Sequence, residues 1–331
     1  MGYKRLSDVN IMGNIGETVY VTCIVKNVDV RPMKNGGESM VFIMKDKDVE
    51  YDARVFGVSE ELKRDILGGK VYDIEVNVKA YDRGKNGISC IVDNNGIRES
   101  QTKPEVFADW VDNLEVYYNK VSDMMQYVSD TKAGRVACKI LTDNWEKFST
   151  WPAATSMHHT SLGGLLMHTA CVTDKCFRDG QYFNGVYGRE FINIKLLVSA
   201  ALIHDVMKIR EYDVDFGEGS VEYSKYSSLE THIVGVASEV KLVAREMDIE
   251  QEPEILELQH CLLSHHGKLE WGSPIKPNMP EAVLLHNADM VDSELWKFNK
   301  VFKELTEQQS KSEWIRGEMK VYYRPTMEIQ D

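Results

Sequence analysis

The feature that most constrains the fold is a change of hydrophobic pattern near residue 100 of the 331-residue chain. Before this point, β-branched and aromatic residues gather in short segments that predict strands at 18–25, 39–44, 51–56, 71–78 and 87–92. After Pro104, apolar residues recur with the helical period, which predicts helices at 105–129, 134–147, 160–178, 193–208, 226–247, 253–266 and 280–305. The sequence therefore predicts a β domain followed by a larger helical domain.

The order of the predicted strands indicates a particular kind of barrel. Between the third and fourth strands, residues 59–67 predict a short helix with Ser59 as its N-cap and Gly68-Gly69 at its end. Five strands with a helix in that place are typical of an OB-fold barrel, and another small barrel is the alternative. We expect an OB-fold at 1–100, a helical connector at 101–150, the main helical domain at 151–305 and a C-terminal tail at 306–331.

Composition narrows the class of protein. A formal net charge of −13 argues against nonspecific coating of nucleic acid, because neutralising phosphates requires a basic surface. Residues 1–100 are nearly balanced, with roughly 15 basic and 16 acidic side chains, so a basic groove there is compatible with the total. The apolar runs are too short to span a bilayer, and the first residues lack the features of a signal peptide. We therefore expect a cytoplasmic protein with no membrane partner and with six reduced cysteines.

All nine histidines lie between residues 158 and 286. Several of them, with neighbouring carboxylates, fall on separate predicted helices: His168, His204-Asp205, His232, His265-His266 and Asp289. A single histidine on an apolar face is more often a hydrogen-bonded core residue, but only a shared site easily explains the whole ordered set. Mixed imidazole and carboxylate ligands suit manganese, iron, cobalt, nickel or zinc. The set therefore predicts a divalent metal site.

Lys208 lies shortly after the His204-Asp205 pair in the sequence. It lies four residues after His204 and three after Asp205, so on a helix it shares their face and could hold an anionic substrate beside a metal. The alternative is an ordinary lysine near a helix C-terminus, where the helix dipole favours a positive charge.

The His204-Asp205 doublet resembles the signature of the HD-domain phosphohydrolase superfamily. More narrowly, the chain resembles the YhaM-type 3′-to-5′ exoribonucleases in the segments HHTSLGGLLMHT (158–169), ALIHDVMKIRE (201–211), LETHIVG (229–235), LLSHHGKLEWGSPIKP (262–277) and PEAVLLHNADMVDSEL (280–295). That family carries an N-terminal OB-fold ahead of its HD domain. The resemblance therefore implies an α+β multidomain protein in which an OB-fold barrel precedes an all-α HD-domain bundle.

The resemblance also implies ligands for two divalent cations. One cation would be held by His168, His204, Asp205 and Asp289. The other would be held by His232, His265 and His266, with Asp205 bridging the two. Asp205 and Lys208 would be the catalytic residues, since Lys208 matches the lysine of the family's HDxGK motif, although Met207 stands where the family usually has glycine. Manganese is the first expectation, with iron, cobalt, nickel, zinc and magnesium as alternatives.

Other residues are candidates for contacts around this site. His158 and His159 are candidates for contact with a substrate phosphate or for support of the ligands. His286 and Asp292 lie three residues on either side of Asp289 and could orient it.

The barrel offers candidates for gripping single-stranded nucleic acid through stacking and charge. These are Phe42, Tyr51, Phe56 and Tyr81 together with Arg31, Lys34, Arg54 and Arg83. The alternative for the aromatic members is a place in the barrel core.

Together these features predict a metal-dependent 3′-to-5′ exonuclease acting on single-stranded RNA, with DNA as a further candidate, through water activated by two metals. One alternative is a phosphohydrolase of small nucleotides, such as cyclic dinucleotides or nucleoside phosphates, which the acidic charge mildly favours. A second alternative is a non-catalytic nucleic-acid-binding protein. A homo-oligomer is compatible with each.

Overall fold

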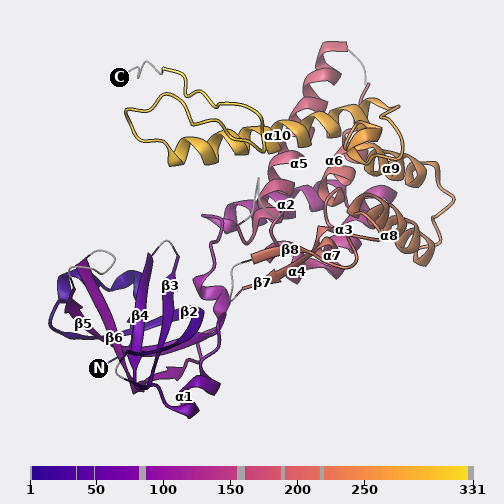
Figure 1. Ribbon diagram of the computed structural model, residues 1–331. Helices are drawn as coiled ribbons and strands as arrows, with labels where there is room; N and C mark the ends of the chain where they lie inside the picture. The colour runs from indigo at the N-terminus through magenta and orange to yellow at the C-terminus, as the bar shows by residue number, and fades with distance from the viewer. Residues whose placement is uncertain are drawn as a thin grey trace. The chain divides into compact units, whose positions relative to one another are not determined.

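The computed structural model describes residues 2–34, 36–47, 49–81, 87–154, 161–187, 191–216 and 220–326. By its internal contacts the chain divides into two compact units (Figure 1). One comprises Met1–Asp109 with Val214–Ser220, and the other comprises Trp110–Asp213 with Val221–Asp331. Each unit has its own hydrophobic core.

The first unit is a closed five-stranded barrel with one very short extra strand. Its elements are β1 (Lys4–Arg5), β2 (Thr18–Pro32), β3 (Glu38–Asp46), β4 (Val49–Phe56), α1 (Glu60–Asp65), β5 (Val71–Ala80) and β6 (Ile88–Glu99). The sheet order is β1-β2-β3-β4-β6-β5, and pairing of β2 with β5 closes the barrel. The predicted OB-fold barrel, with its helix between the third and fourth main strands, is confirmed.

Alternation along the strands builds the barrel core. On β3, Met40, Phe42 and Met44 are fully buried, because successive side chains of a strand point to opposite faces. The side chain of Phe42 therefore belongs to the barrel core, which was the alternative to a role in nucleic-acid binding. At the end of this strand, buried Asp46 forms an ion pair with Arg5 of β1.

The short helix α1 begins where the sequence predicts. The Ser59 hydroxyl accepts a hydrogen bond from the Leu62 amide at 3.2 Å, which satisfies one of the unpaired donors of the first turn. Beyond the helix, the Tyr72 hydroxyl donates to the Asp65 carbonyl at 3.0 Å and accepts from the Leu67 amide at 2.9 Å. These bonds fix the return from α1 into β5.

The second unit is a helical bundle. Its helices are α2 (Leu114–Val128), α3 (Lys132–Asp143), α4 (Trp145–Thr150), α5 (Gly164–Tyr187), α6 (Ile194–Ile203), α7 (Lys208–Glu211), α8 (His232–Glu246), α9 (Pro253–Ser264) and α10 (Pro280–Glu304). α6 lies at the centre: residues 196–203 are all buried, and the helix packs against α2, α3, α5, α9 and α10. Within the described residues, none of the helices is both long and apolar enough to cross a membrane.

The structure corrects several predicted boundaries. The helix expected from residue 105 begins only at Leu114, after a 3₁₀ turn at Pro104–Phe107 and a left-handed Asn113. The helix expected at 193–208 ends at Ile203, and a turn separates it from α7. A two-stranded sheet, β7 (Tyr212–Asp215) with β8 (Ser220–Tyr223), was not predicted.

Candidate metal centre

The sequence-predicted ligands converge at the ends and inner faces of five helices. His168 lies on α5 and Asp289 on α10, while His204 and Asp205 follow the last turn of α6. His232 begins α8, and His265 and His266 follow α9. Two groups of these side chains could each hold a metal ion, since one ligand atom from each member lies within 4.8 Å of the others: His168, His204 and Asp289, and His232, His265 and His266.

The first group centres on the Nε2 atom of His168. This atom lies 3.2 Å from His204 Nε2, 3.2 Å from Asp289 Oδ1 and 3.3 Å from Asp205 Oδ2. His168 and His204 are almost completely buried. The group therefore places two imidazole nitrogens and a carboxylate oxygen around one small volume.

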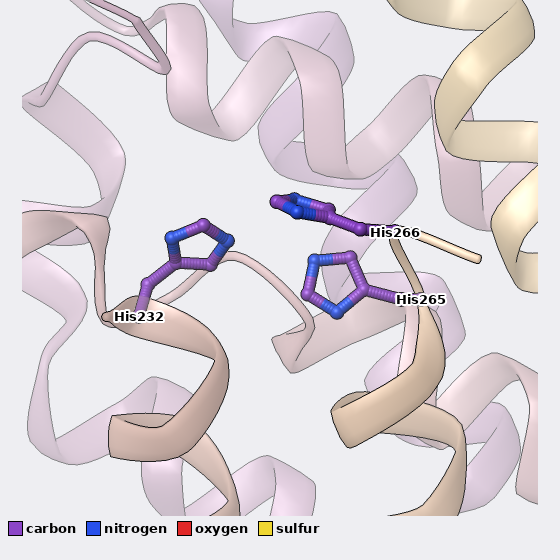
Figure 2. Close-up of side chains that lie close together, drawn as sticks. All are labelled: His232, His265 and His266. Atoms are coloured by element: carbon purple, nitrogen blue, oxygen red, sulfur yellow. The ribbon is translucent and has the colours of Figure 1, made fainter. Parts of the chain in front are cut away.

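The second group consists of the three imidazoles in Figure 2. His232 approaches from the start of α8, while His265 and His266 approach from the end of α9. The ring centroids of His265 and His266 are 4.5 Å apart, and the His232 ring is 5.5 Å and 5.2 Å from them. Three rings gathered in this way offer an all-nitrogen set of ligands.

Asp205 lies between the two groups. Its Oδ2 atom is 3.3 Å from His168 Nε2 and 3.5 Å from His204 Nε2. Its Oδ1 atom is 3.3 Å from His232 Nε2 and 3.9 Å from His265 Nε2. Each carboxylate oxygen therefore faces a different group, which is the arrangement that a bridging ligand requires.

The outer nitrogen of each imidazole lies close to an oxygen. The Nδ1 atoms lie 2.6–2.9 Å from an oxygen of Asp292 (for His168), Ala201 (His204), Glu211 (His232), Leu262 (His265) and Trp271 (His266). Carbonyl and carboxylate oxygens accept hydrogen bonds, so these partners favour a proton on Nδ1 and a lone pair on Nε2. This is how metal-binding histidines are usually oriented.

Burial also supports the interpretation of these imidazoles as metal ligands. The His265 ring is fully buried, and its Nε2 atom has no hydrogen-bond partner among the described residues. Burial, together with the neighbouring imidazoles, holds the pKa of His265 well below its usual range, so the ring is neutral and able to donate a lone pair. The residues present therefore fit divalent cations of the borderline class.

The charges of the centre are strongly coupled. Although burial opposes ionisation, the positive charge of Lys208 and the adjacent imidazoles hold the pKa of Asp205 well below its usual range. Burial also opposes protonation of His168, but hydrogen bonds to three carboxylates raise its pKa well above the ordinary value. Lys208 is itself buried, with Nζ 2.7 Å from Asp205 Oδ2, and this contact raises the pKa of its ammonium group against the effect of burial.

A cavity of about 700 Å³ opens beside the centre. Its lining includes Lys208, His232, His266 and Asp289, so parts of both ligand groups reach it. Its volume lies within the range of about 300–1,000 Å³ that is typical of small-molecule sites. A substrate phosphate placed here would lie next to the candidate ligands and to a buried ammonium group.

The remaining predicted residues have the following places. Asp292 lies against His168, with Oδ2 2.7 Å from Nδ1, and His286 Nδ1 lies 2.9 Å from the carbonyl oxygen of His265. Both therefore support histidines of the cluster, whereas the sequence suggested support of Asp289. His158 and His159 lie outside the described residues.

Glu211 is a functional candidate that the sequence reading missed. Its Oε1 atom accepts a hydrogen bond from the His232 amide at 2.6 Å, and its Oε2 atom is 2.9 Å from His232 Nδ1. Both residues are buried. The carboxylate thus fixes the backbone and the ring of one candidate ligand from behind.

The barrel carries a separate groove of about 470 Å³. Among its lining residues are Arg31, Tyr51, Arg54 and Tyr81. Phe56 is exposed, and the Arg54 guanidinium lies 5.7 Å from the centre of its ring. Lys34 is also exposed, whereas Arg83 lies outside the described residues.

The chain combines an OB-fold barrel with a helical unit. In the helical unit, the family model described as HD domain matches residues 169–294. Over almost its whole length the chain is similar to proteins named 3′-5′ exoribonuclease YhaM. It is 29% identical to the one from Listeria innocua over 331 residues, which covers 98% of this chain and 99% of that protein. It is 26% identical to those from Oceanobacillus iheyensis and Bacillus pumilus, with 95% of this chain and 96% of each relative covered. The resemblance inferred from the motifs is confirmed.

Among solved structures, the asparaginyl-tRNA synthetase from Pyrococcus horikoshii matches with a TM-score of 0.25 and 16% identity, covering 49% of this chain and 38% of that one. A likeness of this size has no bearing on function.

Proposed function

We propose that this protein is a metal-dependent 3′-to-5′ exonuclease that hydrolyses phosphodiester bonds of single-stranded RNA. The observation that carries the proposal is the approach of four buried imidazoles, those of His168, His204, His232 and His265, to the two oxygens of Asp205 at 3.3–3.9 Å, with the partly buried His266 ring beside His265. The names of the relatives supply the direction of attack and the class of substrate.

Two divalent cations fit the donor set. One would be held by His168, His204 and Asp289, and the other by His232, His265 and His266, with one Asp205 oxygen for each. Mixed nitrogen and oxygen ligands without thiolate suit manganese, iron, cobalt, nickel or zinc, and manganese is our first choice among these. When bound, a pair of such cations supplies an activated water and neutralises charge on the phosphoryl oxygens.

The side chains around the centre then have separate tasks. Lys208 lines the cavity and carries a positive charge beside Asp205, so it would stabilise the negative charge that develops on the phosphoryl group. Asp292 and Glu211 keep the rings of His168 and His232 in place. No serine or cysteine nucleophile is required for this chemistry.

The barrel would bind the unpaired strand. Its groove combines Arg31 and Arg54 with Tyr51 and Tyr81, and cations and aromatic rings suit phosphates and stacked bases, although Glu50 and Asp52 also line it. The exposed Phe56 ring beside Arg54 adds a further stacking surface.

The test is a comparison of substrates. Protein loaded with Mn²⁺ is given 5′-labelled single-stranded RNA, the matching DNA and a panel of cyclic dinucleotides. We expect RNA products that shorten from the 3′ end one nucleotide at a time, and we expect this activity to be lost in Asp205→Asn, with manganese content measured in parallel. Turnover of the cyclic dinucleotides alone would replace the proposal with the small-nucleotide alternative.

A further inference from the structure

The cavity beside the metal centre has an aromatic side. Besides the ligands and Lys208, its lining includes Tyr212, Tyr223 and Trp271. Tyr212 is buried, whereas Tyr223 is 67% exposed and Trp271 is 47% exposed. Single exposed aromatic side chains are common, but two that line one cavity together with metal-ligand candidates need a more specific explanation.

Tyr223 is held at the cavity by another aromatic side chain. Its ring lies 5.6 Å from that of Tyr212 at an angle of 62°, and most of its surface remains exposed. The Tyr212 carbonyl in turn accepts a hydrogen bond from the Trp151 indole at 3.1 Å. The Tyr223 ring is therefore supported from one side and available for contact from another.

Trp271 is connected to the metal centre through its backbone. Its carbonyl oxygen lies 2.8 Å from Nδ1 of His266, so its main chain is positioned with a candidate ligand. The ammonium group of Lys268 lies 3.9 Å from the centre of the indole ring, which covers part of that ring with a positive charge. The His286 ring also lies 6.1 Å from the indole, and the 47% of Trp271 that remains exposed is available to a planar ligand.

The cavity thus has two chemically different parts. His232, His266, Asp289 and Lys208 provide the part that suits a phosphate, and Tyr223 and Trp271 provide the part that suits a flat, apolar group. A nucleotide joins these two chemistries in one molecule. Aromatic side chains bind every base, because each base has a π-face for stacking.

We propose that Tyr223 and Trp271 form the binding surface for the base of the 3′-terminal nucleotide, while its phosphate lies at the metal centre. This inference rests on the proposed function, because it places the terminal nucleotide of the strand in the cavity. Stacking on these rings positions the last phosphodiester without selecting among the bases.

The test measures binding and does not depend on turnover. Manganese-loaded protein is titrated by calorimetry with adenosine 5′-monophosphate and with ribose 5-phosphate, which lacks the base. We expect the nucleotide to bind about 5- to 150-fold more tightly, as stacking of one base implies. Tyr223→Ala and Trp271→Ala should each reduce this ratio, and Tyr223→Phe and Trp271→Phe should largely preserve it.

Matched controls separate this effect from a general loss of aromatic surface. Tyr323 and Trp314 are 63% and 57% exposed and do not line the cavity, so Tyr323→Ala and Trp314→Ala should keep the wild-type ratio. Manganese content is measured for every variant. An unchanged ratio in both cavity alanine variants overturns the inference, as does equal binding, or no binding, of the two probes by the wild-type protein.

The outcomes also distinguish this inference from the proposed function. If the protein shortens RNA from the 3′ end but binds both probes equally, the exonuclease proposal stands and the base-binding surface does not. If the ratio depends on Tyr223 and Trp271 but RNA is not shortened, the binding surface stands and the exonuclease proposal does not.

Discussion

Glu211 and Asp292 each lie against the outer side of one imidazole of the candidate metal centre. Glu211 contacts both the amide and the ring of His232, and Asp292 contacts the ring of His168. A carboxylate in this place fixes the orientation of a ligand and increases its basicity. The arrangement of the candidate centre therefore depends on side chains outside the predicted ligand set.

Removing the charge of Glu211 should weaken the centre without removing a ligand. We expect Glu211→Gln to lower manganese affinity or activity by about 10- to 100-fold, because the amide is a weaker acceptor for the His232 ring. Manganese titration followed by RNA cleavage measures both effects. Glu222→Gln is the matched control, since Glu222 is exposed, and an equal loss in that variant would contradict the assigned role.

Loading the centre with manganese should release a proton. Hydrogen bonds to three carboxylates raise the pKa of His168 despite its burial, so its charge stabilises the metal-free protein below the ordinary pKa and is lost as the pH rises through the raised value. A cation must displace that proton, so affinity should increase with pH and about one proton should leave near neutral pH. Calorimetry in buffers of different ionisation enthalpy measures the number of protons released on manganese binding. A number near zero would argue against His168 as a ligand.

Some residues of the candidate site could be predicted from the sequence and others could not. The ordered histidines and carboxylates were identifiable because they fall on separate predicted helices, and the structure brings seven of them together. Glu211 was not identifiable, because its partner His232 is 21 residues away and no local pattern connects them. Tyr223 and Trp271 were missed for the same reason: only the folded chain places them on one cavity.

Two glycines on helices of the second unit differ in the space that the structure leaves for a side chain. A Cβ atom on Gly134, in the first turn of α3, would lie 1.9 Å from the carbonyl oxygen of Val128. A Cβ atom on Gly185, in the last turn of α5, would have nothing within 4 Å. The first glycine is required by its neighbours, and the second is not.

Alanine at these positions should therefore change stability in opposite directions. We expect Gly134→Ala to lower the free energy of unfolding by about 1–3 kcal/mol, because the backbone of the preceding turn must move. Gly185→Ala should raise it by up to about 1 kcal/mol, since alanine is the better helix former. Denaturant unfolding measures both, and a stabilising Gly134→Ala would refute the close approach.

Packing also explains which element boundaries the sequence could not predict. α5 continues past Gly180 to Tyr187. Gly180 leaves room for Ile194 of α6, which would lie 3.1 Å from a Cβ atom at this position. The glycine therefore serves helix packing and does not mark the end of the helix. The apolar run of α6 continues smoothly into His204, so its pattern does not reveal the turn that follows Ile203. The starts of the strands were easier to locate, because alternation on the barrel is local, but β2 and β6 continue to Pro32 and Glu99, beyond the predicted ends at residues 25 and 92.

At the scale of the whole molecule, each unit has a core of its own, as independently folding domains do. The overall charge is strongly acidic, yet the barrel sequence is nearly balanced and includes a groove with Arg31 and Arg54. The net charge of the whole chain therefore does not describe the barrel, whose groove is lined by Glu50 and Asp52 as well as by Arg31 and Arg54.

Arg54→Ala should weaken binding of the strand but leave the chemistry intact. We expect lower affinity for single-stranded RNA and a decrease of about 0.7 in the slope of log affinity against log salt, as loss of one phosphate contact implies. Hydrolysis of a small chromogenic diester should be unchanged. Arg64→Ala on α1 removes the same charge outside the groove, and an equal effect there would exclude a specific role for Arg54.

His204 and His265 occupy equivalent places, each directly after the last residue of a helix. Each ring contacts a main-chain oxygen three residues earlier, Ala201 for one and Leu262 for the other. These oxygens belong to the final turn, where a helix has no amide left to offer them. One interaction thus satisfies a helix end and orients a candidate ligand. We therefore expect cation binding to stabilise these two helix ends, which would appear as slower amide exchange in the last turns of α6 and α9.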